Sequence, residues 1–201
     1  EPGVFMRDID PLLAQHDLML GSVPASRALC TIGGMVGNNS GGEQSLRYGN
    51  TQRWVREITV VLGDGKAYVV KPLTKRQLDA KIAQDTYEGR LYERIYQLIE
   101  ANYDLIKNAR PKVNKNSMGY NLWDVWDRGT QIFDLTHLFS GSQGTLGVIT
   151  DLKMEAVKKP KHSGLLLAYL TSSKHLGEII PAVMKHQPAT FEGFDDITFN
   201  L

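Results

Sequence analysis

The sequence is poor in the features that mark secreted, membrane-spanning and nucleic-acid-binding proteins. It contains one cysteine, Cys30, so no disulfide can form within the chain, and this usage is typical of a reducing compartment. No apolar run approaches the roughly 20 residues that a helix needs to cross a bilayer. The 23 Lys and Arg residues nearly balance the 22 Asp and Glu residues, which gives no electrostatic argument for nucleic acid or an anionic membrane as a partner.

The chain opens on Glu1-Pro2-Gly3-Val4, without an initiator Met and without the basic and apolar regions of a signal peptide. We therefore expect it to begin inside a longer, cytoplasmic protein, with peripheral membrane attachment through the parent protein left open. Its 201 residues, 42% hydrophobic and 22% charged, are ordinary for one large globular domain or one domain plus part of another.

Helical signals lie in three parts of the chain. A short helix is predicted within residues 4–20, and a longer helical region over 74–102, where apolar residues recur at the spacing of one helical face. A third helix is predicted around residues 176–184, kinked or split at Pro181. Residues 21–50 are rich in glycine and small polar residues and are predicted to form a loop.

Strand signals do not alternate regularly with the helices. The β-branched run 58–62, the turn residues 63–66 and the run 67–70 predict a hairpin over residues 57–71. Further strands are predicted over 148–157, 165–170 and 191–194, and residues 103–134 read as irregular. The sequence therefore favours an α+β fold over a doubly wound parallel sheet.

Two glycine-rich segments carry the strongest functional signal. The first glycine loop, residues 30–42, contains Gly33-Gly34 and then Asn38-Asn39-Ser40-Gly41; the second, residues 141–147, runs into a β-branched strand. Backbone amides without a neighbouring Cβ can donate to phosphate oxygens or flavin carbonyls. The first loop alone also fits a structural turn, and neither loop has the Walker A or Rossmann spacing.

Together with Pro24-Ala25-Ser26, Arg47-Tyr48-Gly49 and the hairpin, these loops resemble the FAD-binding domain of the vanillyl-alcohol oxidase / p-cresol methylhydroxylase (PCMH-type) superfamily. The branch they resemble holds D-lactate dehydrogenases, glycolate oxidase flavin subunits and D-2-hydroxyglutarate dehydrogenases. This resemblance implies that residues 1–160 form the second half of the FAD-binding domain, a mixed or antiparallel sheet with flanking helices. Residues 84–134 would be an insertion, and 161–201 the beginning of an α+β substrate-binding cap.

The resemblance also implies which residues contact FAD. The region 31–34 and the region 38–41 would lie along the pyrophosphate and the isoalloxazine side, and residues 143–149 would contact FAD mainly through backbone atoms. The expected cofactor-binding residues are Pro24, Ala25, Ser26, Thr31, Ile32, Gly33, Gly34, Asn38, Asn39, Ser40, Gly41, Gln143, Gly144, Thr145, Gly147, Val148 and Ile149.

The sequence departs from the family pattern at Gln143, where the family usually has Glu. The family's other FAD subdomain would precede Glu1, and most of the cap, with the catalytic base and metal-ligand histidines, would follow Leu201. The catalytic residues of this chain are therefore unknown, no metal site is expected within it, and the isolated chain should bind FAD weakly or not at all.

Three further features have a structural and a functional interpretation. The basic segment 110–122 is a solvated loop or one packed on a partner domain, or else brings Arg110, Lys112 or Lys115 to a carboxylate substrate. Cys30 is expected to be a small buried thiol rather than a covalent flavin attachment point. The five histidines lack metal-ligand spacing, and His137, beside the second loop, is expected to be satisfied locally rather than to act as a base.

The leading hypothesis is an enzyme that oxidises a D-2-hydroxyacid by hydride transfer to FAD and passes the electrons to a quinone, an iron–sulfur protein or oxygen. A second hypothesis keeps the fold and changes the substrate, because alditol, sugar and aryl-alcohol oxidases of the superfamily share these loops, as does a non-redox ether-lipid synthase. A third is a non-catalytic binding module in which the loops are structural.

Overall fold

The computed structural model describes residues 1–113 and 115–199 and has an α+β fold, as the sequence predicts. All strand pairs in the described residues are antiparallel, in three small sheets ordered β3-β2-β7, β1-β8 and β4-β6-β5. The strands are β1 (Leu18–Leu20), β2 (Val55–Val61), β3 (Ala67–Val70), β4 (Leu73–Thr74), β5 (Trp126–Asp127), β6 (Ile132–Phe133), β7 (Val148–Met154) and β8 (Ala156–Lys158).

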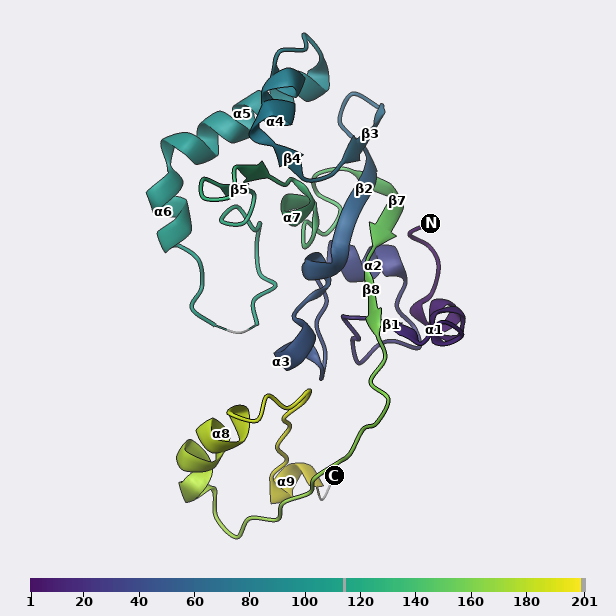
Figure 1. Cartoon of the computed structure of the whole chain (residues 1–201), viewed down its shortest axis with the longest axis vertical. Coiled ribbons are helices and arrows are strands. Elements are labelled where there is room, and N and C mark those ends of the chain that lie inside the picture. Colours follow the sequence, from purple (N-terminus) through teal and green to yellow (C-terminus); the bar gives the residue numbers. More distant parts are fainter. Residues whose placement is uncertain (114, 200–201) are drawn as a thin grey trace.

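The helices are short except for one (Figure 1). They are α1 (Met6–Ala14), α2 (Ile32–Gly37), α3 (Ser45–Tyr48), η1 (Thr51–Trp54), α4 (Lys75–Ile82), α5 (Tyr87–Ala101), α6 (Tyr103–Asn108), α7 (Thr136–Phe139), η2 (Ser173–His175), α8 (Leu176–Met184) and α9 (Asp196–Phe199). None of the helices in the described part of the chain combines the length and the apolar composition that crossing a membrane requires.

The predicted hairpin and the predicted strand 148–157 form the main sheet. β2 pairs with β3 through Ile58↔Val70 and with β7 through Ile58↔Leu152. Alternation of apolar and polar residues along β2 turns Ile58 and Val60, both fully buried, toward one face. Because β7 runs almost directly into β8, which pairs with β1, it joins the main sheet to the N-terminal part of the chain.

The predicted helical region 74–102 forms two helices rather than one. Thr74 caps α4 through a capping box with Gln77, and the hydroxyl oxygen of Thr86 accepts a hydrogen bond from the Gly89 amide at the start of α5. The first helix ends at Ile82, and the cap at Thr86 begins the second.

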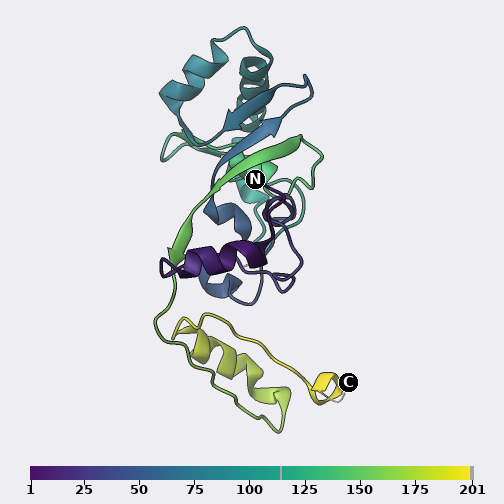
Figure 2. The ribbon, with the colours of Figure 1, turned by 90° about the vertical axis from the view of Figure 1, so that its right-hand side faces the viewer.

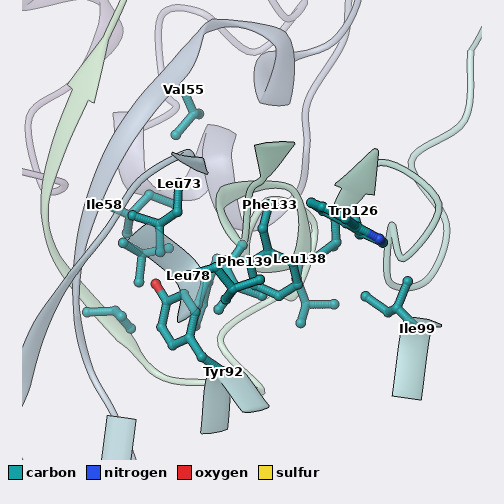
Figure 3. Close-up of a cluster of buried hydrophobic side chains, with 14 of the residues drawn as sticks. Val55, Ile58, Leu73, Leu78, Tyr92, Ile99, Trp126, Phe133, Leu138 and Phe139 are labelled. Atoms are coloured by element: carbon teal, nitrogen blue, oxygen red, sulfur yellow. The ribbon is translucent and has the colours of Figure 1, made fainter. Parts of the chain in front are cut away.

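The main hydrophobic core lies between β2 and the segments that follow it (Figure 3). Trp126, Phe133 and Tyr92 are almost fully buried there, and the Tyr92 and Phe133 ring centroids lie 5.8 Å apart. Residues 84–134, expected to be an insertion, therefore supply large side chains to the core. The predicted irregular region 103–134 also contains α6, β5 and β6.

The C-terminal part of the chain differs from the prediction. Residues 165–170 and 191–194 form no strand, because a strand requires a partner for its backbone hydrogen bonds and neither segment has one. α8 runs through Pro181 without being split. Figures 1 and 2 both show residues 160–199 standing apart from the rest of the chain, and none of residues 160–198 is buried; residues 200–201 of the expected cap lie outside the described residues.

Candidate functional site

The first glycine loop contains a helix, so the prediction of a continuous loop over residues 21–50 is wrong. Thr31 caps α2, its hydroxyl oxygen accepting a hydrogen bond from the Gly34 amide at 3.1 Å. Met35 and Val36 are fully buried and anchor the helix to the core. A cap and two apolar anchors offset the low helix propensity of three glycines in six residues.

The sequence suggested that the amides of Gly33 and Gly34 are free to bind a ligand. In the structure both are already hydrogen-bonded within the chain. The Gly33 amide donates to the carbonyl oxygen of Pro2 at 2.8 Å, and the Gly34 amide is occupied by Thr31. A Cβ on Gly33 would lie 2.6 Å from the Pro2 Cβ. Glycine at position 33 therefore allows the N-terminal segment to lie against the loop, and neither amide is left unpaired for a phosphate in this structure.

The two glycine loops are joined directly by hydrogen bonds. The amide of Gly141 donates to Val36 O at 2.9 Å, and the amide of Gln143 donates to Gly37 O at 2.9 Å. Both donors have positive φ, 88° and 52°, which turns the second loop back onto the end of α2. Segments more than 100 residues apart in the sequence thus form one structural unit.

Two parts of this unit remain accessible. Asn38 is exposed at the end of α2, and residues 143–145 are exposed at the tip of the second loop. Within the described part of the chain, the amides of Gly144 and Leu146 have no hydrogen-bond partner. Accessible amide donors beside one another are suited to an anionic or carbonyl-rich ligand, so this tip fits the backbone contacts that a dinucleotide requires.

A buried polar network supports the end of the first loop. The side-chain amide of Asn39 donates to Gln52 Oε1 at 3.0 Å, and Gln52 also accepts from Asn121 at 3.0 Å. The carbonyl oxygen of Ser40 accepts from Ser22 Oγ at 2.8 Å and from Thr51 Oγ1 at 2.7 Å. These bonds fix the backbone of Asn39 and Ser40 and occupy the Asn39 side-chain amide and the Ser40 carbonyl oxygen.

The other expected cofactor-binding residues lie around this unit. Residues 24–26 directly follow Val23. The backbone of Val23 packs closely against the first glycine loop, since a Cβ on Gly42 would lie 1.9 Å from the Val23 carbonyl oxygen. Gly147 lies against β2, where a Cβ would come within 2.6 Å of the Val60 side chain. Val148 and Ile149 are the first two residues of β7.

A polar pocket of about 300 Å³ adjoins the loops. Residues of the basic segment 110–122, together with Trp123 and Asp124, form one side of the pocket. Residues within or next to the two glycine loops form the other side. The expected cofactor-binding residue Asn39 lines it, as do Arg110 and His137, to which the sequence also drew attention. Asn50, Arg53 and Ser140 were not predicted as site residues. Asn50 directly follows the Arg47-Tyr48-Gly49 motif and Ser140 directly precedes the second loop, so adjacency to the motifs was the available signal.

Cys30 is half-buried and free, slightly more accessible than expected. His137 belongs to α7, and its Nε2 lies 3.6 Å from Asp134 Oδ2. Among the described residues, no group of three or more His, Cys, Asp and Glu side chains is arranged to hold a metal ion.

Residues 1–71, which contain the whole first glycine loop and the hairpin, match the family model described as FAD binding domain. This stretch is similar to known FAD-binding domains. The chain is 27% identical over its full length to D-2-hydroxyglutarate dehydrogenase of Escherichia coli (strain K12), of which it covers 20%. It is 29% identical to glycolate oxidase subunit GlcD of Bacillus subtilis (strain 168), with 98% of this chain and 32% of that protein covered.

These similarities confirm the resemblance to FAD-linked oxidases of the PCMH-type superfamily and FAD as the cofactor of the family. The chain spans between a fifth and a third of the length of these two relatives. A solved alkyldihydroxyacetonephosphate synthase is 18% identical over 81% of this chain and 19% of its own, with a TM-score of 0.45.

Proposed function

We propose that this chain forms part of the flavin site of an oxidoreductase that oxidises a D-2-hydroxyacid of the lactate, glycolate or 2-hydroxyglutarate type. The observation that carries the proposal is the pair of glycine loops, joined by the Gly141–Val36 and Gln143–Gly37 hydrogen bonds, in a chain that matches an FAD binding domain. The names of the two relatives, a D-2-hydroxyglutarate dehydrogenase and a glycolate oxidase subunit, support the substrate class.

In this proposal residues 1–160 are the second half of the FAD-binding domain, with 84–134 an insertion, and residues 161–201 begin the cap. A bound flavin would supply the acceptor for a hydride from the substrate α-carbon, with a quinone, an iron–sulfur protein or oxygen as the final electron acceptor. The chain's own contribution is binding and orientation. The amides of Gly144 and Leu146 and the side chain of Asn38 would donate to the cofactor, while the occupied amides of Gly33 and Gly34 keep the first loop rigid.

The proposed cofactor contacts retain the residues expected from the sequence. They lie in residues 24–26, 31–34, 38–41, 143–145 and 147–149. For Gly33 and Gly34 the proposed contact is made by the exposed surface of α2 rather than by their amides, which are occupied.

Replacing Gly144 with Ala in the protein that contains this chain tests the site. Gly144 has φ +78° and no atom near a Cβ position, so Ala fits sterically but disfavours the backbone conformation that presents the loop amides. We expect the dissociation constant for FAD, measured by flavin fluorescence, to rise about tenfold, or about 1.4 kcal/mol.

Gly65→Ala is the matched control. Gly65 has φ +76°, is exposed in the β2–β3 turn and also has no atom near a Cβ position, so it carries the same backbone strain at a position outside both glycine loops. Equal FAD affinity in the two variants would show that the second loop does not bind the cofactor.

The reaction is tested with the flavin-loaded protein under anaerobic conditions. D-Lactate, glycolate and D-2-hydroxyglutarate are added in turn, and loss of the visible flavin absorbance reports hydride transfer. Bleaching by one of the three supports the proposal. A protein that carries flavin but is bleached only by sugars or other alcohols would overturn the substrate class, and a colourless protein would overturn the flavin site.

A further inference from the structure

The exposed turn of the second glycine loop has a conformation that its own residues do not favour. The Thr145 amide donates to the carbonyl oxygen of Ser142 at 3.0 Å, which closes a four-residue turn. Its two central residues, Gln143 and Gly144, have φ of 52° and 78°, the pattern of a type I′ turn. Glutamine at positive φ costs free energy, and a type II turn, in which only the glycine has positive φ, is the ordinary alternative for this pair. Contacts from outside the turn therefore hold it in its observed form.

One of these contacts is the hydrogen bond from Gln143 to α2, and the other comes from Tyr120. The hydroxyl oxygens of Tyr120 and Thr145 lie 2.8 Å apart. Thr145 Oγ1 also donates to the carbonyl oxygen of Ser142 at 2.6 Å. Because a threonine hydroxyl has a single proton, Tyr120 is the donor to Thr145. The tyrosine therefore adds to the bond that joins the last residue of the turn to its first.

Tyr120 belongs to a strap, residues 115–121, that is joined to the surroundings of both glycine loops by side chains. Asn50 Nδ2 donates to the carbonyl oxygen of Asn116 at 3.1 Å, and Asn121 Nδ2 donates to Gln52 Oε1 at 3.0 Å. The strap contains no helix or strand. In the described part of the chain, no backbone–backbone hydrogen bond joins it to either loop. Its position therefore depends on these side-chain contacts.

We infer that Tyr120 is a positioning residue of the proposed cofactor site. Its hydroxyl holds the second loop in the turn that leaves the amides of Gly144 and Leu146 accessible. The side chain is 45% exposed, so removing its hydroxyl leaves the core intact. The inference rests on the proposed function for the identity of the ligand, FAD, whereas the hold on the turn rests on the hydrogen bonds alone.

Amide hydrogen exchange of the full 201-residue chain without flavin, followed by NMR, tests the hold on the turn. The amides of Gln143 and Thr145 are hydrogen-bonded in the parent chain. In Tyr120→Phe we expect both to exchange about threefold to tenfold faster, because one hydrogen bond no longer opposes local opening. Unchanged exchange in this variant would overturn the inference.

Tyr68→Phe is the matched control. The Tyr68 hydroxyl donates to Asp64 Oδ2 at 2.5 Å in the β2–β3 hairpin, so this variant removes an equivalent hydroxyl from another turn. It should leave the exchange of the second loop unchanged. Equal acceleration of the second loop in both tyrosine variants would show that the effect is not local, and would contradict the role of Tyr120.

Variants of Thr145 show whether Tyr120 acts through it. Thr145→Val removes the acceptor and should speed exchange, while Thr145→Ser keeps the hydroxyl and should restore slow exchange. Adding Tyr120→Phe to Thr145→Val should then cause no further acceleration. Additive effects of the two substitutions would mean that Tyr120 acts by another route, against the inference.

The effect on the cofactor is measured by titrating FAD into the protein that contains this chain. Tyr120→Phe should raise the dissociation constant for FAD about threefold to tenfold, and Tyr68→Phe should not change it. Faster exchange in Tyr120→Phe with unchanged FAD affinity would overturn the positioning role.

Failure of the proposed function gives a different result. A protein that carries no flavin, in a chain whose exchange responds as expected, would reject the oxidoreductase and keep the hold of Tyr120 on the turn. A flavoprotein that oxidises a hydroxyacid, with exchange that ignores Tyr120→Phe, would keep the proposed function and reject the inference.

Discussion

Single glycines set how closely the loops approach their neighbours. At Gly42 a Cβ would lie 1.9 Å from the carbonyl oxygen of Val23, whereas at Gly37 it would meet nothing within 4 Å. The two positions belong to the same loop and differ in what surrounds them. They therefore separate the cost of a steric clash from the general effect of replacing glycine.

Gly42→Ala is expected to lower the free energy of unfolding by about 1–3 kcal/mol, because the added methyl group must displace the backbone at Val23. Gly37→Ala is expected to leave it unchanged or raise it by up to about 1 kcal/mol, because alanine favours the helical conformation of α2. Urea unfolding of both variants and the parent chain measures this. Equal losses in the two variants would contradict the close approach at Gly42.

The same residue-level contacts explain what the sequence did not reveal about the site. The glycine loops were recognisable from local composition. The partner of the Gly33 amide is Pro2, some 30 residues earlier, and no local pattern indicates that pairing. The pocket residues Asn50, Arg53 and Ser140 come together only through the tertiary fold.

At the scale of elements, α5 is tied to β5 by one carboxylate. Glu100, at the end of α5, accepts a hydrogen bond from the buried Trp126 indole at 2.8 Å and pairs with Arg128 at 2.9 Å. The Arg128 hydrogen bond, helped by Trp126, holds the pKa of Glu100 below its ordinary value of 4.5. The ionised carboxylate is therefore favoured in the folded protein.

This depressed pKa makes stability depend on pH with a defined sign. The contribution of Glu100 is complete above pH 4.5 and is lost as the pH falls through the folded-state pKa. Glu100→Gln should lower the free energy of unfolding at pH 7 by about 0.5–1 kcal/mol and lose less stability than the parent below pH 4.5. Thermal unfolding from pH 7 to 3 measures both.

Glu93→Gln is the control on the same helix, where Glu93 accepts a hydrogen bond only from Gln97 among the described residues. If this variant and Glu100→Gln showed the same pH profile, the link between α5 and β5 would not be electrostatic.

Elements with strong local signals were predicted correctly from the sequence. The hairpin of β2 and β3 combines a β-branched run with a glycine turn, and α4 and α5 have an apolar stripe. The helix α2 was missed because its cap, Thr31, and its buried Met35 and Val36 outweigh the glycine composition. The strands expected at 165–170 and 191–194 have strand-like composition but no pairing partner in the described residues.

At the scale of the whole molecule, the part of the chain before residue 160 and the part after it contribute unequally to folding stability. The buried residues belong to the part before residue 160, and none of residues 160–198 is buried. Buried apolar area is the main source of folding free energy. The C-terminal part should therefore contribute little to the stability of the rest.

Deleting residues 160–201 is expected to leave the melting temperature within about 2 °C of that of the full chain, which corresponds to a change well below 1 kcal/mol. Differential scanning calorimetry measures it. Deleting residues 1–5 is the contrasting variant and should lower the melting temperature, because it removes the Pro2 carbonyl that pairs with Gly33. A large loss on C-terminal deletion would show that residues 160–201 pack on the core.

The exposed run from Leu165 to Leu170 also affects how the chain behaves at high concentration. It presents Leu165, Leu166 and Leu167 to solvent, 83%, 88% and 67% exposed, with no charge or proline among its six residues. Uncharged apolar segments with free backbone groups promote intermolecular β-pairing. The lysines at 158, 159 and 161 flank this run in the positions of aggregation gatekeepers, so mutating or acetylating them should lower the concentration at which the chain precipitates.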